Sequence, residues 1–127
     1  MTEIDHNYVN PVSDKYKKEL NELMGENNRS KWTGGSASNS YQSGFKVFNE
    51  YMTHAVYLLF TRQKLTPEEQ QIIETSKIDG MNNRRKFIKF DLFYEKLGQL
   101  YDKRNPGETL TELYPQIIEW CRTENTK

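Results

Sequence analysis

Hydrophobic residues recur along this chain three or four positions apart, which is the spacing of amphipathic helices. The longest such run covers 45–62, where Phe45, Phe48, Met52, Ala55, Val56 and Leu59 form one apolar stripe. The same spacing predicts helices over 13–25, 66–78 and 83–102, and a last helix after Thr109. The sequence contains no alternating runs of β-branched residues and no Asn-Gly hairpin turn. These patterns predict an all-α fold in which 1–127 is a single domain, an irregular array of about four to five helices.

Local signals mark the ends of several of these predicted helices. Thr66 is followed by a proline and two acids, which is typical of a helix start, and Asp79-Gly80 is expected to end that helix near Ile78. Thr109 and Glu112 have the spacing of a capping box. Pro115 then falls in the second turn, where we expect it to kink or delay the helix.

The segment 27–43 interrupts the helical pattern and is rich in Asn, Ser and Gly, so we expect a long loop there. Trp32 and Tyr41 are the large side chains that could anchor it. Gly34-Gly35 at its centre lacks the spacing of a phosphate-binding loop and no strand precedes it, so phosphate binding is not expected from this pair.

Composition narrows the class of protein. The 127 residues include 18 Lys+Arg and 18 Asp+Glu, so the formal net charge is zero and no bulk electrostatic attraction to nucleic acid or anionic lipid is expected. The basic run 84–86 is interpreted as the solvated start of a helix, because acids flank it. Aromatic residues make up 13% of the chain, and those from Phe87 to Tyr101 are expected to fill the core.

The single cysteine, Cys121, allows neither an intrachain disulfide nor a cysteine-based zinc site, and we expect it to be a small buried apolar residue. The longest apolar stretch, near 55–60, is too short to span a membrane. Polar residues follow Met1, so no secretion signal is predicted in this chain.

Candidate chemistry begins at the first residues. Glu3 and His6 have the spacing of the last four residues of H-E-x-x-H, a helix motif in which two histidines bind zinc and the glutamate acts as general base. Thr2 stands where that motif has its first histidine, and a threonine hydroxyl is a poor zinc ligand. The alternative is a polar terminal segment with no role.

The stretch 3–11, with its Tyr-Val-Asn-Pro ending, and the later run 48–55 together resemble bacterial zinc metallopeptidases of the gluzincin type. That resemblance covers roughly residues 3–60. It implies that Glu3 is the catalytic acid or base, that His6 is a zinc ligand and that Glu50 is the third ligand. His54, one turn beyond Glu50, would be an accessory residue. The alternatives are a solvated helix face for Glu50 and a structural or solvent-facing role for His54.

The resemblance implies that this chain corresponds to the C-terminal half of a larger, exported enzyme with peptide substrates. Because the first histidine is absent, zinc binding would be weak or lost, even if His54 or Asp5 joined His6 and Glu50. We therefore expect a metallopeptidase-like domain with an incomplete zinc site and no peptidase activity.

A second interpretation belongs to a different class, a small helical protein-interaction module with no metal or catalytic role. Its partner surface would be the face of Glu50, His54 and Tyr57, together with the loop that carries Trp32. The partner would be the missing N-terminal half or a second copy of the chain. Nucleic acid is not an expected partner, since the net charge is zero.

Overall fold

The computed structural model describes residues 16–25, 28–34, 43–107 and 110–126, and for 110 and 111 it describes only the backbone. These residues form helices joined by short connections, without a strand among them, so the predicted all-α fold is confirmed. The elements are α2 (Lys17–Met24), α3 (Arg29–Trp32), α5 (Gly44–Thr61), α6 (Pro67–Asp79), the π-helical turn η2 (Gly80–Arg84), α7 (Phe90–Asp102) and α8 (Leu110–Asn125). Within this part of the chain, no helix is long and apolar enough to cross a bilayer.

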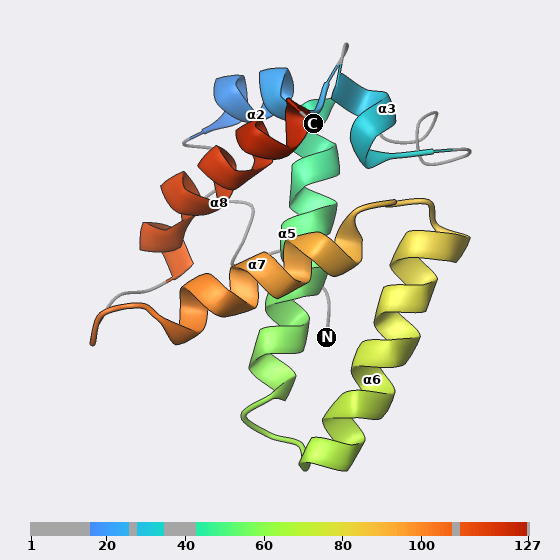
Figure 1. Ribbon diagram of the computed structural model, residues 1–127, viewed down its shortest axis with the longest axis vertical. Coiled ribbons are helices and arrows are strands. Elements are labelled where there is room, and N and C mark those ends of the chain that lie inside the picture. Colours follow the sequence, from blue (N-terminus) through green and yellow to red (C-terminus); the bar gives the residue numbers. More distant parts are fainter. Residues whose placement is uncertain (1–15, 26–27, 35–42, 108–109, 127) are drawn as a thin grey trace.

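Helix α5 is the centre of the fold, and Figure 1 shows α2, α6 and α7 arranged around it. It begins at the N-cap Ser43, whose hydroxyl accepts a hydrogen bond from the Lys46 backbone nitrogen at 3.2 Å. Most of its residues are buried, because neighbouring elements cover it on several sides. The large buried side chains that pack on it from other elements are Leu20, Met24, Trp32, Phe87, Phe90, Phe93 and Tyr114.

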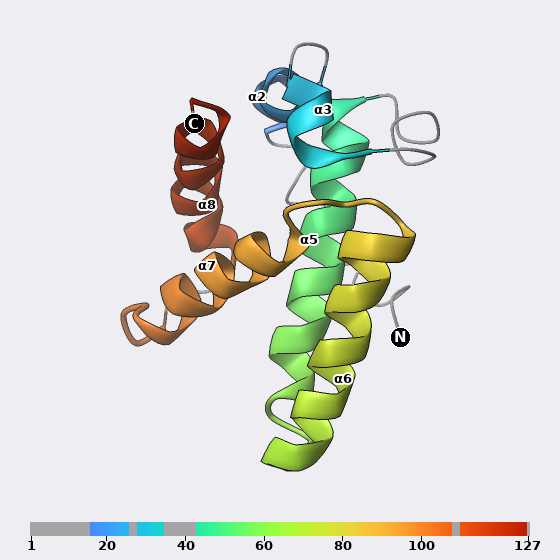
Figure 2. The same cartoon turned by 45° about the vertical axis from the view of Figure 1, so that its right-hand side comes forward.

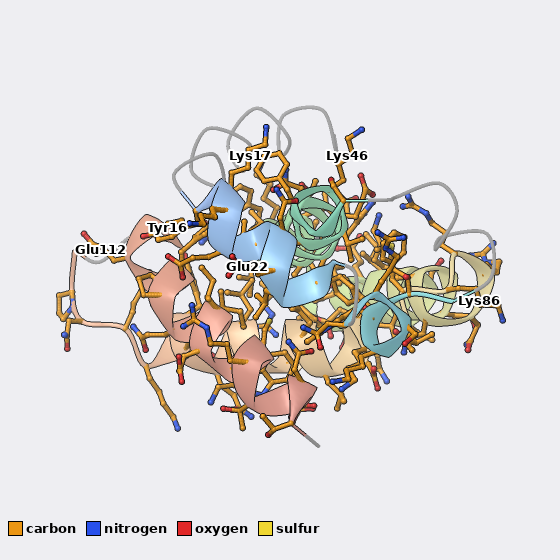
Figure 3. The ribbon with its side chains drawn as sticks, turned by 90° about the horizontal axis from the view of Figure 1, so that it is seen from above. Tyr16, Lys17, Glu22, Lys46, Lys86 and Glu112 are labelled. Atoms are coloured by element: carbon orange, nitrogen blue, oxygen red, sulfur yellow. The ribbon has the colours of Figure 1, made fainter. Side chains whose placement is uncertain are left out.

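The close packing of α2 against the start of α5 depends on a glycine. A Cβ atom at Gly44 would lie 2.4 Å from the Leu20 carbonyl oxygen and 2.6 Å from the Gly25 nitrogen, far inside van der Waals contact. The Asn21 side chain uses this proximity to accept a hydrogen bond from the Phe45 nitrogen at 2.9 Å. Beside them Tyr16, labelled in Figure 3, stacks on Tyr114 of α8 with ring centroids 5.8 Å apart.

Helices α5 and α6 form an antiparallel pair that extends beyond α7 in both ribbon views (Figures 1 and 2). The predicted start of α6 is confirmed, since Thr66 and Glu69 form a complete capping box with hydrogen bonds of 3.2 and 3.0 Å. The predicted end is also confirmed, since the α-helix ends at Asp79, but the chain continues from Gly80 into the π-helical turn η2, which was not predicted.

The helix predicted over 83–102 begins only at Phe90. The backbone of 86–88 is bonded elsewhere: the Lys86 carbonyl accepts from the Gly34 nitrogen at 2.9 Å, and the Ile88 nitrogen donates to the Trp32 carbonyl at 3.1 Å. These contacts with a distant segment replace the first turns of the predicted helix, and Lys86 has a positive φ of 63° there.

The predicted loop 27–43 also needs correction, because its residues Arg29–Trp32 form the short helix α3. The anchoring role predicted for Trp32 is confirmed: its ring is fully buried and its Nε1 donates to Asn125 Oδ1 at 2.7 Å. Most of the remaining loop, with Tyr41, lies outside the described residues.

Helix α8 closes the core against α2 and α7. Pro115 lies inside it as predicted, whereas the proposed cap Thr109 is outside the described residues. Cys121 is fully buried, as predicted, and burial raises the pKa of its thiol well above the ordinary value. This cysteine is therefore an inert packing residue.

Candidate functional site

The structure describes two of the predicted site residues and leaves the others out. Glu3 and His6, with their neighbours Thr2 and Asp5, lie outside the described residues. Glu50 and His54 lie one turn apart on α5, and His54 Nε2 is 3.2 Å from Glu50 Oε2. His54 is only 7% exposed, so the solvent-facing alternative for this residue is wrong.

Two cations from other elements meet this pair. Lys77 of α6 places its Nζ 3.0 Å from His54 Nδ1. Arg85, directly after η2, places Nη2 3.1 Å from Glu50 Oε2 and Nη1 3.0 Å from His54 Nε2. The result is a cluster of one carboxylate, one imidazole and two cations, contributed by three segments that are distant in the sequence.

A neutral imidazole has one lone pair, so it cannot accept hydrogen bonds from both Lys77 and Arg85. One arrangement of protons satisfies all the contacts except that between Arg85 Nη1 and His54 Nε2. The Lys77 ammonium group can only donate hydrogen bonds, so His54 Nδ1 is the acceptor. His54 Nε2 then carries the ring hydrogen and donates it to Glu50, which also accepts from Arg85. His54 is therefore neutral in this state, and a second ring proton would point at the Lys77 ammonium group.

Electrostatics agree with that assignment. Burial lowers the pKa of His54, and the positive charges of Lys77 and Arg85 lower it further. The hydrogen bond with Glu50 and the charge of that residue raise the pKa, but the net shift is downward. Burial acts against the charge on Glu50, but contacts with His54 and Arg85 hold the pKa of its carboxyl below the ordinary value. The cluster thus pairs a charged glutamate with an uncharged histidine.

Beside the cluster, the surface is hollowed between α5, α6 and η2 into a cleft of about 320 Å³, which we call the α5–α6 cleft. His54 and Tyr57 line it from α5, and Ile73, Ser76 and Lys77 line it from α6. Gly80, Met81, Arg84 and Arg85 complete its wall. The lining side chains that carry full charge are thus all cationic.

Arg84 and Lys77 differ in how firmly they are held. Arg84 is 71% exposed, and its ion pair with Asp79 is long, at 3.9 Å. The Lys77 ammonium group lies 4.9 Å from the centre of the Tyr57 ring, a cation–π contact that adds to its hydrogen bond with His54. Lys77 is therefore partly buried and held by two contacts, whereas Arg84 is mostly exposed to solvent.

The backbone that delivers the two arginines is irregular. Arg84 is the last residue of the π-helical turn, Arg85 follows it, and Lys86 has a left-handed conformation at the edge of the molecule seen in Figure 3. π-Helical turns and non-glycine residues with positive φ both cost conformational energy and occur often at functional sites. Their coincidence beside a basic cleft marks this segment as the candidate site.

The described residues do not fit a zinc site. No group of three histidine, cysteine, aspartate or glutamate side chains gathers among them. Glu50 and His54 do lie together, but the positions from which zinc would approach them are taken by the positive charges of Lys77 and Arg85. Any part that Glu3 and His6 play in metal binding stays a prediction.

Other predictions about this surface need correction. The basic run 84–86 does not begin a helix, and Arg85 turns inward to Glu50 rather than into solvent. Trp32 is fully buried, so its own side chain is not part of the predicted partner surface, and most of the loop that carries it lies outside the described residues. Nothing in the sequence pattern pointed to Lys77; its alignment with His54 depends on how α6 packs along α5.

Comparison with protein-family models, with curated proteins and with solved structures finds no match to this chain. The resemblance to gluzincin metallopeptidases therefore has no support beyond the residues that suggested it.

Proposed function

We propose that this chain is a small helical binding module, that its ligand site is the α5–α6 cleft, and that its ligand carries negative charge. One observation carries the proposal: Lys77, Arg84 and Arg85 line a single concave surface in a chain whose formal net charge is zero. Arg84 and Arg85 each pair with a carboxylate, Asp79 and Glu50, and an anionic ligand in the cleft would be attracted by all three cations at once.

The state of His54 supports binding rather than catalysis. A general base needs an available lone pair directed at its substrate, and the ring nitrogen of His54 that carries the lone pair accepts a hydrogen bond from Lys77. The other nitrogen is directed at Glu50. His54 thus holds Lys77 at the cleft, and Glu50, which accepts from both His54 and Arg85, holds Arg85 there.

The metallopeptidase-like interpretation, with its incomplete zinc site, is the less favoured proposal. It depends on Glu3 and His6, which are outside the described residues, and on Glu50, whose carboxylate is engaged by Arg85. The binding-module proposal depends only on contacts that the described residues make.

The test is a titration of the isotope-labelled chain with anions of different kinds, namely acetate, citrate and phosphate, followed by NMR shifts of the backbone amides. We expect at least one anion to shift the amides of 76–77 and 84–85 in a saturable way that added salt weakens. Lys77→Ala and Arg84→Ala should weaken binding, whereas Lys103→Ala, which removes an exposed charge beyond the end of α7, should leave it unchanged. The proposal is wrong if no anion binds, or if all three variants behave alike.

A further inference from the structure

The end of α8 bonds to segments from distant parts of the chain, and one of these segments leads to the candidate site (Figure 1). We propose that residues 124–125, which we call the clasp, hold α3 and the segment 86–89 so that they open and close as one unit, and that closure of this unit keeps Arg85 at the α5–α6 cleft. The clasp is a property of the free protein and does not depend on what the cleft binds.

Asn125 is the centre of the clasp. Its side-chain oxygen accepts a hydrogen bond from Trp32 Nε1 at 2.7 Å, and its side-chain nitrogen donates to the Leu23 carbonyl at 2.9 Å. Its backbone carbonyl accepts from Lys31 Nζ at 2.6 Å. One residue near the end of α8 is thus bonded to both α2 and α3. These partners lie 93 to 102 positions away in the sequence, so the bonds form only when the chain is folded.

Glu124 extends the clasp to the residue that precedes α7. Its carboxylate lies 3.6 Å from Lys89 Nζ, and its side chain is only 7% exposed. The same ammonium group lies 5.1 Å from the centre of the Trp32 ring, which is a cation–π contact. Lys89 therefore contacts both α3 and the end of α8, and these contacts meet at the same indole ring that Asn125 bonds.

Backbone hydrogen bonds connect α3 to the segment 86–89. The Trp32 carbonyl accepts from the Ile88 nitrogen at 3.1 Å. The Gly34 nitrogen donates to the Lys86 carbonyl at 2.9 Å. Because both bonds involve the end of α3, a displacement of α3 would break the bonds that fix this segment.

Arg85 directly precedes the segment 86–89 and lines the α5–α6 cleft. Its Nη2 lies 3.1 Å from Glu50 Oε2, and its backbone nitrogen donates to the Gly80 carbonyl at 2.8 Å. The chain that follows Arg85 is fixed by its bonds to α3, so opening of that chain would release one side of the residue that faces Glu50. The clasp thus couples the end of α8 to the cleft.

Two local features favour a cooperative opening over independent movements. The helix α3 has four residues, and a helix of that length is not stable on its own in water. Lys86 has a positive φ of 63°, a conformation that costs energy and persists only where the surrounding structure imposes it. Both features depend on contacts with other segments, so they lose their support together when the clasp opens. Groups of residues that open in this way form one cooperative unit.

Hydrogen exchange of the full chain, followed by NMR without any ligand, measures this opening. The amides of Gly34, Ile88 and Arg85 should share one opening equilibrium, as a single unit requires. Asn125→Ala removes two side-chain hydrogen bonds and should speed the exchange of these amides by about tenfold. The α6 amides of 70–77 should keep their rates, because α6 is held by its own contacts with α5.

Arg122→Ala is the matched control, since Arg122 also lies near the end of α8 but its ion pairs are with Glu19 and Glu119. This variant should change the rates of the unit by no more than about twofold. Lys31→Met is a milder test from the side of α3, because it removes the bond to the Asn125 carbonyl and keeps the folded chain even if Asn125→Ala unfolds it. It should speed the same amides by about threefold.

The outcomes separate the parts of the proposal. Different opening equilibria for α3 and the segment 86–89 would overturn the single unit. An effect of Asn125→Ala no larger than that of Arg122→Ala, or unchanged rates in Lys31→Met, would overturn the clasp. An unchanged rate at the Arg85 amide alone would overturn the coupling to the cleft. Failure of every anion to bind would overturn the proposed function and leave the clasp intact, because exchange is measured in the free protein.

Discussion

Replacing Tyr51 by phenylalanine tests whether one buried hydroxyl holds the segment that carries Arg85. The Tyr51 hydroxyl donates to the Trp32 carbonyl and accepts from the Lys89 backbone nitrogen at 3.1 Å. It therefore links α5 to two segments that the sequence separates widely. Burial raises the pKa of this hydroxyl far above its ordinary value, so it stays protonated and acts as both donor and acceptor.

The cost of the substitution can be estimated from what each partner retains. The Trp32 carbonyl still accepts from the Ile88 nitrogen at 3.1 Å, so its loss is that of one ordinary hydrogen bond, about 1 kcal/mol. The partly buried Lys89 N–H loses the hydroxyl as acceptor, which costs about 1–2 kcal/mol. The ring itself remains and keeps its edge contacts with Trp32 and Phe87. Together the free energy of unfolding should fall by about 2–3 kcal/mol, which lowers the melting temperature by roughly 10 °C.

Urea unfolding followed by circular dichroism measures this loss, and tryptophan fluorescence reports on the surroundings of Trp32. The matched control is Tyr101→Phe, which removes a hydroxyl whose partner, the exposed Gln63 side chain, lies 3.3 Å away. That change should cost no more than about 0.5 kcal/mol. If Tyr51→Phe costs no more than Tyr101→Phe, the hydroxyl does not hold the segment and the argument fails.

Three other predictions concern the candidate site and α6. Folding stability should fall as the pH drops below 6.5, the ordinary pKa of histidine, because the unfolded chain then binds a proton that folded His54 resists. Urea midpoints measured between pH 5 and 7 should therefore rise with pH. This dependence should be lost in His54→Gln and kept in His6→Gln. Thr66→Ala removes the bond that the Thr66 hydroxyl accepts from the Glu69 nitrogen and should cost about 1 kcal/mol in urea unfolding, and an unchanged midpoint would contradict a role for the cap. Zinc titration by calorimetry should give no binding heat, whereas binding that both His6→Ala and Glu50→Ala abolish would support the gluzincin-like site.

The parts of the fold that follow local rules were predictable. The central helix was expected over 45–62 and is observed at Gly44–Thr61, because its apolar stripe repeats at helical spacing over many turns. The start of α6 was expected at Thr66 because a capping box uses residues only three positions apart. Burial of Phe87, Phe90, Phe93 and Tyr94 was predicted as well, whereas Tyr101, at the end of the same run, is only partly buried.

The errors lie where distant segments decide the backbone. Local spacing favoured a helix from 83, yet the backbone of 86–88 bonds to Trp32 and Gly34, more than fifty positions earlier. The helix Arg29–Trp32 was missed because a polar, glycine-containing segment has no apolar periodicity, and the side chain that fixes it, Asn125, is near the other end of the chain. Neither contact can be read from neighbouring residues.

The candidate site likewise has one part that was predictable from the sequence and one part that was not. The proximity of Glu50 and His54 follows from their separation by one helical turn. The arrival of Lys77 and Arg85 does not, since it requires both the alignment of α6 along α5 and the extra width of the π-helical turn. The sequence therefore indicated half of the cluster, where the metal stays a prediction, and the two cations are the basis of the anion site that we propose.

Polar contacts hold α6 in that alignment, together with the partly buried side chains of Ile73 and Ile78. Its buried residue is Gln70, whose side chain bonds to Thr61 and to the Leu58 carbonyl at the end of α5. One turn later Glu74 accepts from the Tyr94 hydroxyl, and one turn after that Lys77 bonds to His54.

These three contacts, at positions 70, 74 and 77, occupy one face of the helix. A helix without a broad apolar face is placed by its hydrogen bonds and charges, so a change of charge in the α5–α6 cleft acts directly on the forces that position it. An anion that draws Lys77 away from His54 would exchange one of these contacts for another. The helix that forms the wall of the cleft would thus respond to what the cleft binds.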